Sequence, residues 1–232
     1  TLGVRAVHAI PPEIVCGQIE AVMEDLQPVA IKIGMVNDIQ IVHVIADCIR
    51  KYSPEHIIYD PVMVSTSGRK LMTNEGIEEI KKELLPLVTL VTPNIDEAKV
   101  LTGKSIQNTQ DMLEAAKQLS DSYQIHILIK GGHLEGDQMC DLLYSPDHTY
   151  YIYEEKKIES KNLHGTGCTL SSAIATYLAK GYPLHESIRH AKAYITQAIL
   201  AGKELHIGHG NGPLWHFPDS IAQMCTICAV VS

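Results

Sequence analysis

Asn162-Leu163-His164-Gly165-Thr166-Gly167-Cys168-Thr169-Leu170-Ser171-Ser172-Ala173 is a short glycine-rich turn that leads into a segment of small residues. Gly165 and Gly167 permit backbone conformations closed to other residues and let a ligand approach the main chain. A helix is expected to follow, because apolar residues recur there at helical spacing: Leu170, Ile174, Tyr177 and Leu178. The free N–H groups and the dipole of a helix N-terminus attract anions. The stretch therefore predicts an anion site with the thiol of Cys168 at its mouth.

Length and composition indicate one globular domain. The chain has 232 residues, of which 45% are hydrophobic and 20% are charged, which is ordinary for a water-soluble α/β domain of this size. We find no internal repeat and no linker, so a single domain over residues 1–232 is expected. The chain opens at Thr1 without a methionine, and little precedes the first expected helix. We therefore expect the opening strand of the domain and its turn to be missing from the front.

Charge and hydropathy narrow the range of partners. The formal net charge of -8 does not favour binding to the phosphate backbone of a nucleic acid. A small anion can still bind to local N–H groups against the overall field. The sequence contains no apolar run long enough to span a bilayer and no signal peptide, so we expect no membrane partner and a cytoplasmic location.

Cysteine and histidine spacing does not suggest a disulfide framework or a metal site. The six cysteines show no framework spacing, which favours reduced thiols. Cys225 and Cys228 form a lone C-x-x-C near the C-terminus, which we interpret as incidental. The histidines of the tail match no standard metal-binding spacing; they are His206, His209 and His216.

Strand and helix patterns alternate along the first 132 residues. Helices are expected at about 13–26, 37–51, 73–84, 95–101, 109–122, 168–180 and 184–200. Strands are expected at 29–35, 56–59, 88–91 and 125–130, followed by antiparallel strands at 141–144 and 149–154 and a third at 156–160. The first four strands are continuous apolar runs, as in strands covered on both faces. The sequence therefore predicts an α/β fold with a mostly parallel central sheet, helices on both faces and a small antiparallel segment.

Polar residues gather where the expected parallel strands end, which is where ligands bind in open parallel sheets. Asp60 follows one strand and is either a turn-forming residue or a carboxylate that holds hydrated Mg²⁺ near phosphates. Asn94 and Glu97 follow the next strand, and their spacing fits a helix capping box as well as a phosphate or metal site. Lys130 ends a buried strand, so its ammonium group needs either a phosphate partner or access to solvent.

Cys168 admits three interpretations. It could accept a proton from a substrate hydroxyl while the neighbouring N–H groups hold phosphoryl charge. It could be an acyl-transfer nucleophile with His164 or His133 as its base. It could also be a small residue that packs the helix against the sheet. The two preceding glycines favour a functional role.

At Gly165-Thr166-Gly167-Cys168 the sequence resembles the ribokinase superfamily, in which a Gly-Thr-Gly-Asp turn forms the anion hole and the Asp is the catalytic base. The cysteine version resembles the vitamin-kinase branch. Further segments, in order along nearly the whole chain, are similar to the hydroxymethylpyrimidine/phosphomethylpyrimidine kinases of thiamine biosynthesis. These segments are Ala30-Ile31-Lys32-Ile33-Gly34-Met35, Asp60-Pro61-Val62-Met63, Thr92-Pro93-Asn94-Ile95-Asp96-Glu97-Ala98, Lys130-Gly131-Gly132-His133 and Gly210-Asn211-Gly212-Pro213-Leu214.

The resemblance implies a ribokinase-like three-layer sandwich, Mg²⁺ and ATP as cofactors, and a homodimer. It implies that ATP phosphorylates the hydroxymethyl group of 4-amino-5-hydroxymethyl-2-methylpyrimidine. The resulting monophosphate is then phosphorylated to the diphosphate. Carried over by position, the implied roles are Cys168 as catalytic base, Gly165, Thr166 and Gly167 as anion hole, Lys130 on the ATP phosphates, Asp60 and Glu97 on the Mg²⁺ side, Asn94 and Thr166 at the nucleotide, and Met35, Val62 and Cys168 at the pyrimidine.

The sequence departs from this family at its front, since the opening strand, the Gly-rich substrate loop and a pyrimidine-contacting Gln would lie upstream of Thr1. Other interpretations therefore stay open. One is a pyridoxal/pyridoxine kinase of the same cysteine-bearing type. A cysteine acyl-transfer enzyme and a non-catalytic protein that binds pyrimidine or thiamine metabolites are the alternatives from other classes.

Overall fold

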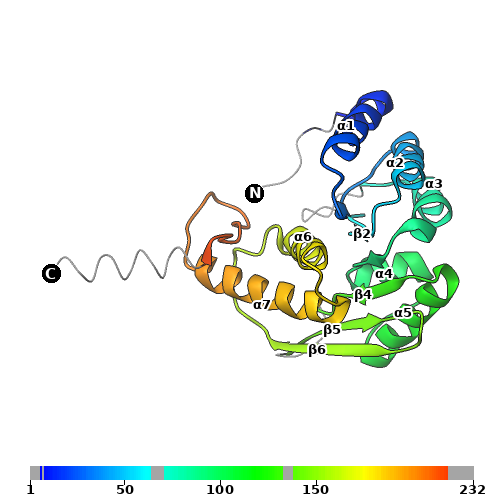
Figure 1. The fold of residues 1–232 in the computed structure, drawn as a ribbon. Helices are drawn as coiled ribbons and strands as arrows, with labels where there is room; N and C mark the ends of the chain where they lie inside the picture. The colour runs from blue at the N-terminus through cyan, green and yellow to red at the C-terminus, as the bar shows by residue number, and fades with distance from the viewer. Residues whose placement is uncertain (1–5, 7, 64–70, 133–137, 219–232) are drawn as a thin grey trace.

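The computed structural model describes residues 6, 8–63, 71–132 and 138–218, which form one six-stranded sheet with helices on both faces (Figure 1). The strand order is β1-β2-β3-β4-β5-β6, with β1 to β4 parallel and β5 and β6 antiparallel. The strands are β1 (Ala30–Ile33), β2 (His56–Tyr59), β3 (Leu90–Val91), β4 (His126–Ile129), β5 (Gln138–Tyr144) and β6 (Tyr150–Lys156). The predicted mostly parallel sheet with an antiparallel segment is confirmed.

Two helical layers cover the sheet. One face carries α6 (Thr166–Ala179) and α7 (Leu184–Gly202). The other carries α2 (Ile39–Tyr52), α3 (Asn74–Glu79), α4 (Ile95–Thr102) and α5 (Thr109–Tyr123), and α1 (Pro12–Asp25) packs beside α2 (Figure 1). Successive strand residues alternate between the layers: Ile127 and Ile129 pack in the core under α2 to α5, while Leu128 packs under α6 and α7. Burial on both faces explains why the strands are continuous apolar runs.

The expected third antiparallel strand at 156–160 is wrong. β6 ends at Lys156, and the chain then runs toward the segment that follows α7. Asn162 fixes this course, because its buried side-chain amide donates to the carbonyl oxygens of Gly202 at 2.7 Å and Leu205 at 2.8 Å. These bonds give the backbone carbonyl groups at the end of α7 and after it a hydrogen-bonding partner.

The helix expected at 73–84 changes its geometry partway. α3 ends at Glu79 and continues as the π-helical turn η1 (Ile80–Leu84) and the 3₁₀ turn η2 (Leu85–Leu87). Pro86 explains the second change, since it has no N–H to donate to a carbonyl oxygen of the preceding turn. Leu84 and Leu85 remain buried, so the core is continuous through the altered turns.

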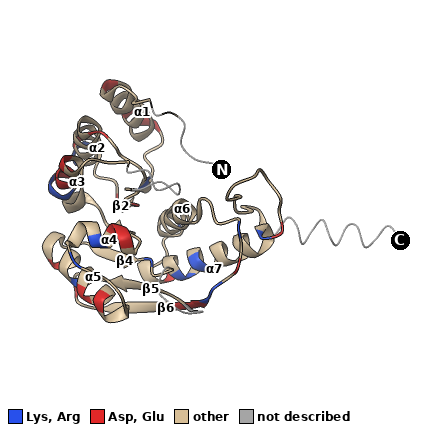
Figure 2. Cartoon of the chain, turned by 180° about the vertical axis from the view of Figure 1, so that it is seen from behind, with Lys and Arg blue, Asp and Glu red and all other residues tan. Residues whose placement is uncertain are grey.

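Charged residues are interspersed over the outer helices (Figure 2). Ion pairs link neighbouring helices on this surface, among them Arg50 of α2 with Glu83 at 2.7 Å and Lys51 of α2 with Glu20 of α1 at 2.7 Å. Among the described residues no helix is both long and apolar enough to cross a membrane. The expectation of a single domain over residues 1–232 stays a prediction.

Candidate active site

Three strand ends bring Asp60, Thr92 and Lys130 together on the α6 side of the sheet. Lys130 Nζ lies 2.8 Å from Asp60 Oδ1, and the Thr92 hydroxyl donates to the same oxygen at 3.1 Å. Asp60 is 2% exposed, so its carboxylate is more than a turn former. Lys130 does not simply extend to solvent either, because its side chain is 17% exposed and ends on Asp60. The sequence predicted either a phosphate partner or solvent for the Lys130 ammonium, and the structure shows a carboxylate of the same chain as its partner.

The helix N-terminus expected at the glycine-rich turn faces this ion pair. Gly165 precedes α6 with a φ of 91°, a left-handed conformation that favours glycine, and the helix begins at Thr166. Both the N–H and the hydroxyl of Thr166 donate to the carbonyl of Leu163. Within the described part of the chain, no protein group accepts from the N–H of Gly167 or Cys168. Two free donors therefore remain at the positive end of a 14-residue helix.

Gly167 brings the first turn of α6 close to the ion pair, and its backbone conformation does not itself favour glycine. Its φ is not positive, and it lies within the first turn of α6. A Cβ atom at this position would lie 3.3 Å from Lys130 Nζ and 3.8 Å from Asp60 Oδ2. The missing side chain leaves a small cradle between the helix N-terminus and the ion pair. An anion in this cradle would meet the helix donors and the Lys130 ammonium together.

Two hydroxyl residues of the site were missed by sequence reasoning. Thr92 donates to Asp60 Oδ1. The Ser171 hydroxyl, one turn into α6, lies 3.5 Å from Asp60 Oδ2 and 3.1 Å from the carbonyl oxygens of Gly167 and Cys168. Both side chains are fully buried. Their signal was present, since Thr92 directly follows β3 and Ser171 comes four residues after Gly167 on the same helix face.

Asn94 and Glu97 form the capping box of α4. The Glu97 backbone N–H donates to Asn94 Oδ1 at 2.9 Å, and the Asn94 N–H donates to Glu97 Oε2 at 2.8 Å. A short parallel bridge joins Asn94 to Lys130, so the cap lies at the same edge of the sheet. Burial raises the pKa of Glu97, and the Asp60 carboxylate adds to the rise, while Lys130 opposes it. The capping interpretation is confirmed, and a further role at a nucleotide or metal stays a prediction.

Cys168 is an exposed free thiol on the first turn of α6. It opens onto a groove of about 500 Å³ between α6 and α7, whose lining includes Tyr177, Tyr194 and His216. Among the described residues no histidine bonds to this thiol, and His164 is exposed with its backbone paired to Gly212. His133, the other base considered for acyl transfer, lies outside the described residues, as do Cys225 and Cys228. The paired base that an acyl-transfer cysteine needs is therefore not formed by His164.

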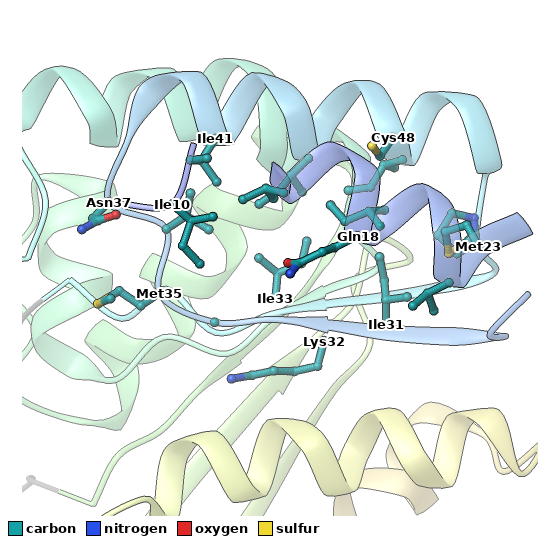
Figure 3. Close-up of a pocket in the computed structure, with 18 of the residues that line it drawn as sticks. Ile10, Gln18, Met23, Ile31, Lys32, Ile33, Met35, Asn37, Ile41 and Cys48 are labelled. Carbon is teal, nitrogen blue, oxygen red and sulfur yellow. The ribbon is translucent and has the colours of Figure 1, made fainter. Parts of the chain in front are cut away.

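Met35 and Val62 are two of the residues that the resemblance assigns to the pyrimidine ring. Met35 is 49% exposed and lines a largely apolar cavity of about 600 Å³ between α1, α2 and β1 (Figure 3). Val62 is half-buried in the segment after Asp60 and does not line that cavity. Figure 3 shows Lys32 extending from β1 toward α6, away from most of the cavity lining. The structure therefore places Met35 near one end of the cavity and leaves its contact with a substrate ring a prediction.

The oxygen donors at the strand ends suit a hard cation. Asp60 and Glu97 are both buried at this edge, and the Asp60 carboxylate contributes to the raised pKa of Glu97. Within the described residues no group of three or more His, Cys, Asp or Glu side chains could hold a metal ion. Magnesium commonly binds one or two carboxylates and completes its shell with water and phosphate oxygens. The residues present fit that mode of binding and would depend on a phosphate ligand.

Comparison with known proteins places this arrangement among kinases of ribokinase-like fold. The hydroxymethylpyrimidine/phosphomethylpyrimidine kinase of Rhizobium meliloti is 44% identical over 218 residues, which are 94% of this chain and 81% of that protein. The crystal structure of phosphomethylpyrimidine kinase from Clostridium difficile is 41% identical, covers 85% of this chain and 80% of its own, and superposes with a TM-score of 0.75. The pyridoxal kinase of Staphylococcus aureus in complex with AMP-PCP is 31% identical, covers 91% and 76%, and gives a TM-score of 0.82.

The family model described as phosphomethylpyrimidine kinase matches residues 1–215. The chain belongs to the phosphomethylpyrimidine kinase family. It is therefore a phosphotransferase, and membership of a kinase family implies the use of ATP. The sequence-based assignment of family, fold and enzyme class is confirmed.

Proposed function

We propose that this chain transfers the γ-phosphoryl group of ATP to the hydroxymethyl group of 4-amino-5-hydroxymethyl-2-methylpyrimidine, and then phosphorylates the monophosphate to the diphosphate for thiamine biosynthesis. One observation carries the proposal. Gly167 and Cys168, whose N–H groups have no acceptor among the described residues, lie on the helix turn that meets the Lys130–Asp60 pair at the Gly167 cradle. In a member of this family, such a cradle is suited to a transferring phosphoryl group.

The proposed first phosphorylation balances as a single in-line displacement. The Cys168 thiolate accepts the proton of the substrate hydroxyl, and the hydroxyl oxygen forms a bond to the γ-phosphorus. The bond from that phosphorus to the β–γ bridging oxygen breaks, and ADP leaves with the electron pair. The N–H groups of Gly167 and Cys168 and the Lys130 ammonium hold the negative charge that the phosphoryl oxygens carry.

In the second phosphorylation the acceptor is a phosphate monoester. Its second pKa is about 6, so at neutral pH most of it already carries the attacking oxygen without a proton. Cys168 then has less proton transfer to do than in the first phosphorylation. The same cradle still holds the transferring group, so the two steps should depend equally on Gly167 and Lys130 but unequally on Cys168.

Several parts of the proposal rest on the family resemblance carried over by position. Asp60 and Glu97 would hold Mg²⁺, which supplies charge neutralisation to the phosphates when bound. Asn94 and Thr166 would line the nucleotide, and Met35 and Val62 the pyrimidine ring. A homodimer and a cytoplasmic location are part of the same proposal. Buried carboxylates at the nucleotide side of the sheet support the Mg²⁺ assignment.

The decisive experiment compares acceptors with the full natural protein. ADP release and product mass are measured with ATP and Mg²⁺, using the hydroxymethylpyrimidine, its monophosphate, or pyridoxal. We expect the pyrimidine and its monophosphate to be phosphorylated with the higher kcat/KM. Pyridoxal is a specific competitor here, because pyridoxal kinases superpose with a TM-score of 0.82 against 0.75 for the phosphomethylpyrimidine kinase. Turnover of pyridoxal alone would overturn the proposal, and tight pyrimidine binding without turnover would indicate a non-catalytic binding protein.

A further inference from the structure

A buried ion pair lies outside the residues used so far. Lys192 of α7 places its Nζ 2.6 Å from Asp141 Oδ2 of β5, and the two residues are 6% and 7% exposed. Glu155 of β6 lies 3.6 Å from the same ammonium and accepts from the Thr196 hydroxyl at 3.1 Å. A buried ion pair often adds little stability relative to apolar side chains of similar size. The energetics of folding therefore do not by themselves account for this pair.

The second oxygen of Asp141 connects the pair to the candidate active site. Asp141 Oδ1 accepts from the backbone N–H of Gly131 at 2.9 Å, and this bond is buried. Gly131 directly follows Lys130, whose own N–H donates to the carbonyl of Pro93 at 2.8 Å. The peptide groups on both sides of the Lys130 Cα atom are thus held by hydrogen bonds. The direction in which the Lys130 side chain leaves the backbone is fixed as a result.

Gly131 allows the close approach that this arrangement needs. A Cβ atom on Gly131 would lie 1.9 Å from the carbonyl oxygen of Cys140. No side chain fits at such a distance, so only glycine lets the turn after β4 lie against β5. Cys140 is the residue before Asp141, and the close contact therefore brings the Gly131 N–H within reach of the Asp141 carboxylate.

We propose that Asp141 and Lys192 are positioning residues for phosphoryl transfer. Lys192 holds the Asp141 carboxylate, Asp141 holds the Gly131 peptide, and that peptide sets the direction of Lys130 toward Asp60 and the Gly167 cradle. The inference rests on the proposed function in one respect, since Lys130 is there assigned to the ATP phosphates. Neither Asp141 nor Lys192 contacts Lys130 Nζ, so both act through the backbone.

The test separates positioning from stability by comparing four variants. Lys192→Met removes the cation that holds Asp141, and Asp141→Leu removes the acceptor for Gly131. Asp141→Asn combined with Lys192→Met keeps an acceptor oxygen while removing both buried charges. Ile188→Val, one turn before Lys192 on α7 and also buried, is the matched control that loosens the same helix.

We expect KM for ATP to rise about 10- to 100-fold in Lys192→Met and in Asp141→Leu, as for the loss of a charge-assisted hydrogen bond. KM for the pyrimidine should stay within about twofold, and the double variant should recover most of the ATP affinity. The Ile188→Val control should lower the melting temperature and leave both KM values unchanged. Direct binding of a non-hydrolysable ATP analogue is measured in parallel for every variant.

The inference is overturned if Lys192→Met and Asp141→Leu lose stability but bind ATP like the natural protein. It is also overturned if the charge-free double variant folds and remains as weak in ATP binding as Asp141→Leu. Failure of the proposed function is a separate result: the natural protein would bind the ATP analogue but phosphorylate no pyrimidine. In that event the binding measurements still decide whether Asp141 and Lys192 position Lys130. If a single variant does not fold, the double variant and Asp141→Asn alone take its place.

Discussion

At the scale of single residues, the Lys130–Asp60 pair means that a bound nucleotide would meet a lysine that already has a carboxylate partner. The sequence indicated that the ammonium at the end of β4 needs a partner, and the structure supplies Asp60 at 2.8 Å with Thr92 and Ser171 on the same carboxylate. Phosphate oxygens at the cradle would therefore share Lys130 with Asp60. A paired Lys130 is also pre-oriented, which lowers the entropy cost of binding a phosphate.

Replacement of Cys168 by alanine tests the proton-acceptor role. We expect kcat for the first phosphorylation to fall about 10²- to 10⁴-fold, the usual contribution of a positioned base, while ATP binding changes little. The second phosphorylation should fall less, because its acceptor oxygen is already deprotonated. Rates for the two acceptors are measured separately, with Cys16→Ala of α1 as the matched cysteine control. Full activity on the first acceptor would remove Cys168 from the mechanism.

At the scale of elements, the glycine in the first turn of α6 lowers helix stability and leaves open space beside Lys130. Alanine is a better helix former than glycine by about 1 kcal/mol, so glycine at position 167 has a local cost. The cost is explained by the short distance of 3.3 Å that would separate a Cβ atom from Lys130 Nζ. The element that we propose to bind the anion is therefore less stable at the position where the anion would lie.

Gly167→Ala and Gly17→Ala form a matched pair of predictions. Gly17 lies in the middle of α1 and is exposed to solvent, and a Cβ atom there would meet nothing within 4 Å. We expect Gly17→Ala to raise the melting temperature by about 1–4 °C without any change in turnover. Gly167→Ala should raise KM for ATP and lower kcat for both acceptors. Thermal unfolding and steady-state kinetics check the pair, and an active Gly167→Ala enzyme would contradict the cradle.

The cap of α4 gives a pH-dependent prediction. Burial raises the pKa of Glu97 above its ordinary value of 4.5, so the folded chain binds this proton more tightly than the unfolded chain. The contribution of Glu97 to the free energy of unfolding should therefore decrease as the pH rises from about 4.5 through the raised pKa. Glu97→Gln keeps an acceptor for the Asn94 N–H and removes the titration.

Urea unfolding of the natural protein and of Glu97→Gln at several pH values between 4 and 8 measures this effect. We expect the variant to gain stability relative to the natural protein as the pH rises, and the gain to level off above the raised pKa. Asp96→Asn serves as the control, since Asp96 is exposed beside Glu97. A stability difference that does not vary with pH would contradict the raised pKa.

At the scale of the whole molecule, ligand binding and unfolding are linked. A nucleotide at a concentration of about 100 times its Kd should stabilise the folded chain by about 2.7 kcal/mol, which corresponds to a rise of roughly 5–10 °C in melting temperature. Lys130→Ala should lower the basal melting temperature, because it leaves the buried Asp60 carboxylate unpaired. It should also reduce the further rise that ATP and Mg²⁺ produce.

The rise caused by the nucleotide is the informative quantity, because a simple loss of stability would leave it unchanged. Lys117→Ala on the exposed face of α5 is the control and should keep the full rise. Differential scanning fluorimetry with and without nucleotide gives both values. An equal rise in the natural protein and in Lys130→Ala would show that Lys130 does not contact the nucleotide.

Most of the fold and part of the site could be predicted because their signals are local. Continuous apolar runs indicated the parallel strands, and the helix expected at 37–51 is α2, whose cap Asp38 accepts from the Gln40 N–H at 2.7 Å. The third antiparallel strand failed because Asn162 makes its bonds to residues 40 and more positions away. Asp141 and Lys192 were missed for the same reason, although a charged residue on the buried face of α7 was a usable signal.

The sequence by itself determined the family, most of the order of strands and helices, and the glycine-rich start of α6, since their signals lie in residues close together in the chain. Only the tertiary structure decided that Lys130 pairs with Asp60, that Gly167 provides space, and that Lys192 reaches Gly131 through Asp141. The physical reason is that these contacts depend on strand register and on how α6 and α7 pack against the sheet. Residues 51 and 70 positions apart meet there, and no local pattern encodes such distances.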